Sequence, residues 1–300
     1  MSLRVWFWLI SLSVLWGGSF FFAKVAVSQL GPLTVVFGRV AIAAFALNAV
    51  LAISRDSLFR RGTPWLTYFA MGFLNNALPF SLIFWAQTHI ASGLASILNA
   101  TTPLCTVLVA HFFTPDEKIS APKVVALLAG FAGVALLIGP STMQQAEADL
   151  WGQLACLAAA FSYACAGVFG RRFKAMGIAP MEAAAGQITA SSLLILPIMM
   201  IVDRPWALAA PPSLTVWAAV VALALLSTAL AYVLYFRILA AAGATNLLLV
   251  TFLIPVTSIL LGAAFLTEQL GLLEFAGMAL ISIGLVIIDG RAARLLYPAK

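Results

Sequence analysis

The chain has 300 residues, of which 63% belong to the hydrophobic set and 9% are charged, and its formal net charge is +6. Its mean hydropathy is +1.08. A soluble core of this size does not need so much apolar surface. Composition therefore excludes an ordinary soluble enzyme or binding module and predicts an all-α integral membrane protein.

The chain divides into ten apolar runs, each close to the roughly 20 residues that a helix needs to cross a hydrocarbon layer of about 30 Å. The runs lack the period-two alternation of barrel strands, so helices are expected. The connections are too short to hold a soluble domain. The expected spans are 5–27, 32–53, 65–88, 92–113, 122–140, 151–172, 181–202, 215–238, 244–266 and 271–289. A cleaved signal peptide is the alternative for the first run, although that run is long and has no A-x-A site.

Lysine and arginine counts predict the orientation, because the side that keeps the positive charges is usually cytoplasmic. With the amino terminus inside, only Arg204 falls in an outer loop, while Lys24 and Arg39 lie within helices near their outer ends. Both termini are then cytoplasmic, and the net charge reflects topology and lipid headgroups rather than a nucleic-acid partner. The inner positions are Arg4, Arg55, Arg60, Arg61, Lys118, Lys123, Arg171, Arg172, Lys174, Arg237, Arg291, Arg294 and Lys300.

The three cysteines, Cys105, Cys156 and Cys165, all fall inside expected helices. A structural disulfide is not expected, and no cysteine spacing suggests a metal site. We expect no metal, no cofactor and no catalytic residue.

The second half of the sequence resembles the first. When 82–116 is laid over 234–268, Leu82 meets Leu234, Pro103 meets Pro255 and Asp116 meets Glu268; a separate match pairs Gly38 with Gly186. Each half has five expected helices, so the second must cross the membrane in the opposite sense. The predicted organisation is a first repeat at 1–140, an external loop at 141–150, a second, inverted repeat at 151–290 and a cytoplasmic tail at 291–300.

Inverted repeats are typical of carriers, in which two similar halves exchange conformations around a shared site near the midplane. Pro103 and Pro255 each lie near the middle of an expected helix, and we interpret them as matched helix breaks. A simple kink, with the freed carbonyl bound by a neighbouring serine or threonine, is the alternative for either proline alone.

These features resemble the drug/metabolite transporter superfamily, in its EamA-type exporter branch. The resemblance rests on the ten helices in two halves, on "LWGGSFFFAK" in the first span, on P-x6-R from Pro32 to Arg39, and on a mid-helix proline followed thirteen residues later by an acid. Within that branch the chain looks most like bacterial exporters of aromatic amino acids. The resemblance implies spans 1–4 and 6–9 around a central cavity, with spans 5 and 10 outside, in a bacterial inner membrane. Gln187 stands where the first half has Arg39.

Polar side chains at membrane depth are expensive, so we expect them to face the bundle interior. None of those near the midplane is a carboxylate, which favours a facilitator or exchanger over a proton-coupled pump. Aromatic rings there could stack on an apolar or aromatic substrate. The predicted substrate-binding residues are Trp16, Phe20, Asn76, Phe80, Asn99, Thr102, Tyr163, Ser227, Tyr232 and Thr251.

Lys24 and Arg39 have two interpretations. Both are estimated to lie within about two turns of the outer surface, from which a long basic side chain snorkels to headgroups at little cost. Alternatively, one of them binds a substrate carboxylate or holds a gate.

We therefore predict an exporter of small metabolites, functional as a monomer, with aromatic or other neutral amino acids as substrates and hydrophobic drugs as the alternative. Nucleotide sugars or phosphates would require several basic residues at the midplane. An intramembrane enzyme is the competitor from another class, but the chain has no H-E-x-x-H and no G-x-S-x-G. A membrane scaffold is disfavoured by the repeat.

Overall fold

The structure is a computed structural model that describes residues 2–53, 58, 62–115, 117–138, 147–208, 210–247 and 249–289. All regular elements in these residues are helical. They are α1 (Leu3–Val27), α2 (Pro32–Ile53), α3 (Trp65–Gly72), η1 (Phe73–Ala77), α4 (Leu78–Ala86), α5 (Ser92–Asn99), α6 (Thr102–Phe113), α7 (Ala121–Ile138), α9 (Glu147–Ala175), α10 (Pro180–Val202), η2 (Pro205–Ala207), α11 (Leu214–Ala224), η3 (Leu225–Leu230), α12 (Ala231–Leu247), α13 (Val250–Phe265) and α14 (Leu272–Asp289).

The elements combine into the ten predicted spans. Eight are helices long and apolar enough to cross a membrane, and two shorter apolar helices follow, at Val250–Phe265 and Leu272–Ile288. Three spans are composite: α3, η1 and α4 form the third, α5 and α6 the fourth, and α11, η3 and α12 the eighth. The all-helical, ten-span fold is therefore confirmed in the described residues, with most boundaries within a few residues of those expected.

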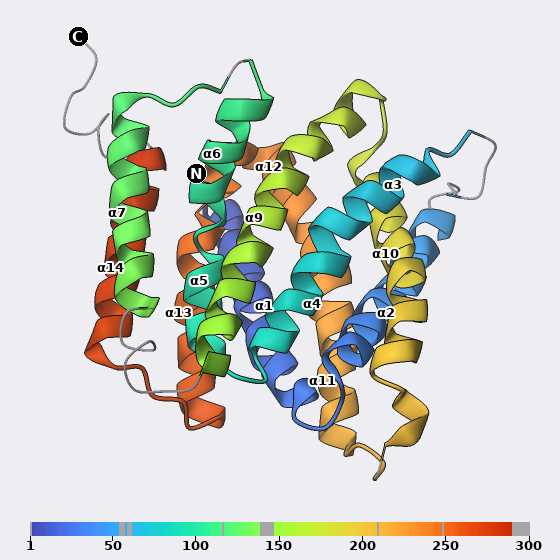
Figure 1. Cartoon of the computed structure of the whole chain (residues 1–300). Coiled ribbons are helices and arrows are strands. Elements are labelled where there is room, and N and C mark those ends of the chain that lie inside the picture. Colours follow the sequence, from blue (N-terminus) through green and yellow to red (C-terminus); the bar gives the residue numbers. More distant parts are fainter. Residues whose placement is uncertain are drawn as a thin grey trace.

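The spans run alternately up and down, so the bundle has two faces (Figure 1). We call the face where α1 begins and α14 ends the terminal face, and the opposite face, where α1 turns into α2 and α13 into α14, the distal face. The helix α1 runs from the terminal to the distal face, whereas α9 runs from the distal to the terminal face. The half that begins with α9 is thus threaded in the opposite sense to the half that begins with α1.

The two halves pack on each other through several pairs of helices. α2 packs on α10, α1 on α13, and α4 on α9. The last spans of the halves, α7 and α14, pack together at one edge of the bundle (Figure 1). Their backbones approach closely, since a Cβ at Gly133 would lie 2.7 Å from the carbonyl oxygen of Gly277. Small residues allow such close helix contacts in membranes.

The two prolines differ in their surroundings. Pro103 lies in the first turn of α6, directly after a turn at Ala100 and Thr101 that separates α5 from α6. Proline fits there because first-turn N–H groups have no helical acceptor. Pro255 instead lies inside α13, which continues to Phe265, so the prediction of a helix break at Pro255 is wrong. Gly243, whose φ of 77° only glycine adopts readily, lies before α13, at the end of the eighth span.

Each half also carries a π-helical segment in the middle of a span. η1 lies in the third span and η3 in the eighth. The repeat alignment that pairs Leu82 with Leu234 places η1 over η3, so Asn75 corresponds to Ser227 and Asn76 to Thr228. Short π segments often occur at functional sites, because the extra residue turns side chains out of the regular helical register.

Some predictions lie outside the described residues. These are the role of Asp116 in the repeat, most of the external loop at 141–150, the tail at 291–300, and the inner-face positions Arg55, Arg60, Arg61, Arg291, Arg294 and Lys300.

Candidate functional site

Arg39 of α2 reaches from the first half into the π segment of the second. Its Nε donates to Thr228 Oγ1 at 2.9 Å, its Nη1 to Ser19 Oγ at 3.1 Å, and its Nη2 to the carbonyl oxygen of Ser227 at 3.4 Å. The guanidinium carbon lies 3.7 Å from the ring centre of Phe80 and 5.7 Å from that of Phe84. Only 6% of Arg39 is exposed.

All of these partners are neutral. No carboxylate among the described residues pairs with the Arg39 guanidinium. A buried charge is costly unless it is paired and hydrogen-bonded, and the neutral hydroxyls, carbonyl and aromatic faces compensate only part of that cost. Arg39 therefore places an unpaired positive charge inside the bundle.

The snorkelling interpretation of Arg39 is wrong. A count of residues from the helix end places Arg39 near the outer surface, but its long side chain extends along the bundle interior to Ser19 and to η3. The interior is thus not free of ionisable groups, because it contains this cation.

Gln187 of α10 makes the corresponding contact in the opposite direction, from the second half to the π segment of the first. Its Oε1 accepts from Asn75 Nδ2 at 3.0 Å and from Asn76 Nδ2 at 3.4 Å. Asn75 Nδ2 also donates to the Tyr232 hydroxyl at 3.2 Å, and that hydroxyl donates to Asn76 Oδ1 at 3.5 Å. Asn76 is completely buried and Gln187 is 4% exposed. This cluster is fully amide and hydroxyl in character.

Neighbouring glycines allow both contacts. Gly38 precedes Arg39, and a Cβ there would lie 2.7 Å from Val220 of α11. Gly186 precedes Gln187, and a Cβ there would lie 2.7 Å from the ring of Tyr68 in α3. At both positions the helix bearing the polar side chain approaches the span with the opposite π segment too closely for any larger residue.

Two tyrosines lie near the clusters. Tyr163, on α9, and Tyr232, on α12, lie close enough to Arg39 for an electrostatic interaction, and the Tyr232 hydroxyl hydrogen-bonds with Asn75 and Asn76. Tyr232 also stacks on Phe236, with ring centres 6.0 Å apart. Trp16 lies on α1 with its ring 5.8 Å from that of Tyr235. Trp16 therefore contacts α12, the helix that also bears Tyr232. Six of the predicted residues come together at the centre: Arg39, Asn76, Phe80, Tyr163, Ser227 and Tyr232.

The remaining predicted site residues differ in their contacts. Thr102 Oγ1 donates to the carbonyl oxygen of Asn99 at 2.7 Å, so it satisfies the backbone at the helix break. Asn99 Oδ1 is buried and has no hydrogen-bond partner among the described residues. Phe20 is a buried core residue whose carbonyl oxygen accepts from Gln87. Thr251 is half-buried on α13.

Lys24 contacts the backbone of a turn at the distal face. Its Nζ donates to the carbonyl oxygens of Gln87 at 2.6 Å and Ile90 at 2.9 Å, beyond the carboxyl-terminal end of α4. A cation is favoured at that end of a helix by the helix dipole. Lys24 therefore holds a turn at the distal face rather than extending into headgroups.

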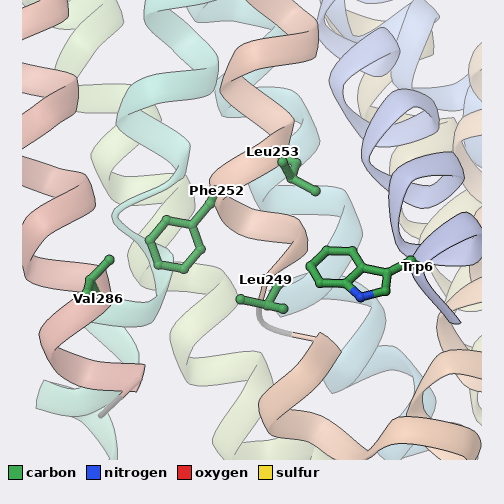
Figure 2. A pocket seen from close by; sticks show the side chains of 5 residues that line it. All are labelled: Trp6, Leu249, Phe252, Leu253 and Val286. Carbon is green, nitrogen blue, oxygen red and sulfur yellow. The ribbon is translucent and has the colours of Figure 1, made fainter. Parts of the chain in front are cut away.

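Two surface hollows lie away from this centre. One, of about 210 Å³, lies between α1, α13 and α14 and is lined by Trp6, Leu249, Phe252, Leu253 and Val286 (Figure 2). The other, of about 470 Å³, lies along α11 and η3 and includes Trp217 and Val221. Both are apolar and face the lipid side of the bundle. At the centre, the side chains of Arg39, Asn76 and Gln187 are buried.

Gln187, Asn75, Ser19 and Thr228 are missing from the predicted site set. The repeat alignment contains the signal for Gln187, because it places this residue over Arg39. The match that pairs Leu82 with Leu234 places Asn75 and Asn76 over Ser227 and Thr228, so two adjacent polar residues recur at one position of both halves.

Two similar halves of opposite threading, joined through buried polar clusters at mid-span, define a multi-pass membrane carrier. The comparison with protein families agrees with this class: the chain belongs to the EamA-like transporter family, whose model matches it twice, over residues 3–139 and 150–289. The double match confirms the internal repeat. It also makes the chain a transporter rather than an enzyme.

Relatives cover nearly the whole chain. The uncharacterized transporter YoaV of Bacillus subtilis is 26% identical over 94% of this chain and 95% of its own length. The uncharacterized inner membrane transporter YedA of Escherichia coli K12 is 27% identical over 97% of this chain and 92% of its own. A crystal structure of a protein with 22% identity superposes with a TM-score of 0.67 and covers 98% of this chain and 99% of that one, which supports the fold.

Proposed function

We propose that the chain exports small zwitterionic amino acids, chiefly those with aromatic or other apolar side chains, by alternating access. The observation that carries this proposal is Arg39, a buried guanidinium whose partners are all neutral. A substrate carboxylate would supply the missing anion. A guanidinium and a carboxylate form two parallel charge-assisted hydrogen bonds. These are stronger than hydrogen bonds between neutral groups.

The surroundings of Arg39 suit the rest of such a substrate. Phe80, Tyr163 and Tyr232 present rings on which an aromatic side chain gains from offset stacking. The Ser227 Oγ is buried and has no hydrogen-bond partner among the described residues. Together with the amide oxygens of the Gln187 cluster, it offers acceptors for a substrate ammonium group.

The same cation argues against cationic hydrophobic drugs, the alternative substrate class. A second positive charge within a few ångström of Arg39 in a medium of low dielectric is repelled. Phosphorylated substrates are also disfavoured, because a doubly charged group usually requires more than one basic partner.

The described carboxylates lie in turns or at helix ends, as Glu182, Asp203, Glu268 and Glu274 do. Glu182 is buried in the first turn of α10, where it accepts from the Tyr68 hydroxyl at 3.1 Å, and no carboxylate among the described residues pairs with Arg39. We therefore propose a facilitator or exchanger, driven by the substrate gradient, that works as a monomer.

The relative YedA is named an inner membrane transporter, and we propose the same membrane here, with the basic terminal face in the cytoplasm.

Counterflow into proteoliposomes tests this function. We expect vesicles preloaded with phenylalanine to accumulate labelled phenylalanine without a pH gradient, and unlabelled tryptophan to compete. Phenylalaninamide, which lacks the carboxylate, should compete at least ten times less well. Equal competition by the amide would overturn the Arg39–carboxylate contact. Accumulation that requires a pH gradient would overturn the facilitator.

A further inference from the structure

One turn at the distal face is held from both sides by opposite charges. The turn at 87–91 joins α4 to α5. Lys24 binds its carbonyl oxygens at Gln87 and Ile90. Glu268, from the turn between α13 and α14, accepts from the backbone N of Ser92 at 2.8 Å, from Ser92 Oγ at 2.8 Å and from the backbone N of Gly93 at 3.2 Å. The cation thus lies beyond a helix carboxyl terminus and the anion at a helix amino terminus, as helix dipoles favour.

A second carboxylate makes the same kind of contact nearby. Asp203, which follows α10, accepts with Oδ2 from the backbone N of Thr34 at 2.6 Å and from Thr34 Oγ1 at 2.9 Å, in the first turn of α2. Asp203 and Glu268 both belong to the second half, and α2 and α5 both belong to the first. The two contacts therefore join the halves at the distal face.

The backbone at both carboxylates is strained. Arg204, directly after Asp203, has a φ of 48°, and Thr267, directly before Glu268, has a φ of 56°. In the described residues these are the two non-glycine residues with positive φ. A β-branched residue such as threonine rarely adopts this conformation. Such conformations persist where surrounding contacts impose them, and they cluster at clamps and switches.

We propose that Asp203 and Glu268 are latches that hold the distal entrance of the transporter shut. Opening this entrance separates the second half from the amino termini of α2 and α5, so both carboxylates must release their donors. Release returns the carboxylates and the exposed N–H groups to water, which makes the step reversible. This inference rests on membership of a transporter family and not on the proposed amino-acid substrate.

The alternative explanation is that the carboxylates are ordinary helix caps that contribute only to stability. The two explanations differ in one observable. A latch controls the access of water-soluble reagents to the centre from one side, whereas a cap within a rigid contact does not.

Labelling of a thiol at the centre measures that access. Ser227 is 1% exposed, so a cysteine at this position in a Ser227→Cys variant reports on access to the centre. A membrane-impermeant maleimide is added to right-side-out vesicles and, separately, to inside-out vesicles. Modification is read peptide by peptide by mass spectrometry, so the native cysteines can remain. We expect Glu268→Gln to raise the labelling rate about ten-fold, because a charged acceptor is lost. The increase should occur only in the vesicles that present the distal face to the reagent.

Glu274→Gln is the matched control. Glu274 lies in the first turn of α14, six residues from Glu268, and an added Cβ at Gly271 would lie 2.8 Å from its Oε2, so it faces its own turn. In the Glu274→Gln variant, the labelling rate of the introduced cysteine should stay within about two-fold of the rate in the Ser227→Cys protein. Equal rates for Glu268→Gln and Glu274→Gln would overturn the latch. So would an increase of equal size from both sides, which indicates a loosened fold.

Two further variants keep the proposal testable if Glu268→Gln does not fold. Thr267→Asn replaces a β-branched residue by one that tolerates positive φ, and it should lower the labelling rate several-fold by stabilising the latched state. Thr34→Cys/Asp203→Cys should form a disulfide across the second latch. Oxidation should then stop labelling from the distal side, and dithiothreitol should restore it. Labelling that continues after verified disulfide formation would overturn the proposal.

Discussion

Arg39 and Gln187 occupy corresponding positions of the two halves and make the same type of contact with opposite chemistry. Each lies directly after a glycine at a close helix contact, and each reaches the π segment of the other half. In one case a cation meets the hydroxyls and carbonyl of Ser19, Ser227 and Thr228. In the other an amide meets Asn75 and Asn76.

The two halves share one feature and differ in another. In both, the contact links the halves at mid-span, where a carrier changes conformation. They differ in the charge of the side chain that makes the contact. One of the two contacts is positive and the other is neutral, so under the proposed function the substrate carboxylate has a preferred side.

Removing the charge should have the largest effect. In Arg39→Gln both contacts become amide contacts, and we expect KM for phenylalanine to rise about 10- to 100-fold, since a hydrogen bond to a charged group contributes about 1.5–3 kcal/mol. Counterflow kinetics in proteoliposomes measure this. Arg39→Lys keeps the charge but loses the planar fork, and it should lose less. An unchanged KM in Arg39→Gln would mean that the guanidinium does not contact substrate.

Moving the charge should have the next largest effect. Gln187→Arg adds a second buried cation near Arg39, so we expect it to lower the thermal unfolding midpoint clearly. The exchange Arg39→Gln/Gln187→Arg has only one cation and should recover most of that stability. It should still transport about ten-fold more slowly than the parent, because the charge now lies beside η1 rather than η3. Full transport by the exchanged protein would show that the two positions are equivalent.

Substitutions of the two glycines test the close helix contacts that precede Arg39 and Gln187. Gly186→Ala would place a Cβ 2.7 Å from three atoms of the Tyr68 ring, whereas Gly38→Ala would contact only one methyl group of Val220 at that distance. Overpacking costs about 1–3 kcal/mol, so unfolding midpoints should fall by about 2–10 °C. The decrease should be larger for Gly186→Ala, because a ring wedged in the core cannot move aside. Gly167→Ala, where no atom lies within 4 Å, is the control.

The smallest effect is expected at Ser227. Its Oγ has no hydrogen-bond partner in the described structure, so Ser227→Ala should leave the unfolding midpoint within about 1 °C of the parent. Transport should still fall about two- to five-fold if the hydroxyl contacts substrate. Ser191→Ala should show the opposite pattern, because Ser191 Oγ donates to the carbonyl oxygen of Gln187 within its own helix. A Ser227→Ala variant with normal transport would remove this residue from the site.

The sequence predicts the spans well because hydrocarbon thickness fixes the length of an apolar run. It predicts the pairing of Arg39 with Gln187 only through the repeat, and it does not predict their depth, because counting from a helix end ignores the reach of a long side chain. The π segments are also missed, because the paired polar residues Asn75–Asn76 and Ser227–Thr228 mark their positions but do not reveal the extra residue in the helical turn. The helix break expected at Pro255 is absent, because α13 continues through this proline to Phe265.

The close contact between α7 and α14 has a consequence for the ancestry of the fold. Each of these helices presents a glycine face, with Gly133 against Gly277 and Gly130 against Gly284, and each finds its partner in the other half. A protein consisting of a single five-span unit would leave that face uncovered. To satisfy it, two such units would have to insert into the membrane in opposite directions and associate, so gene fusion would turn a dual-topology dimer into one chain.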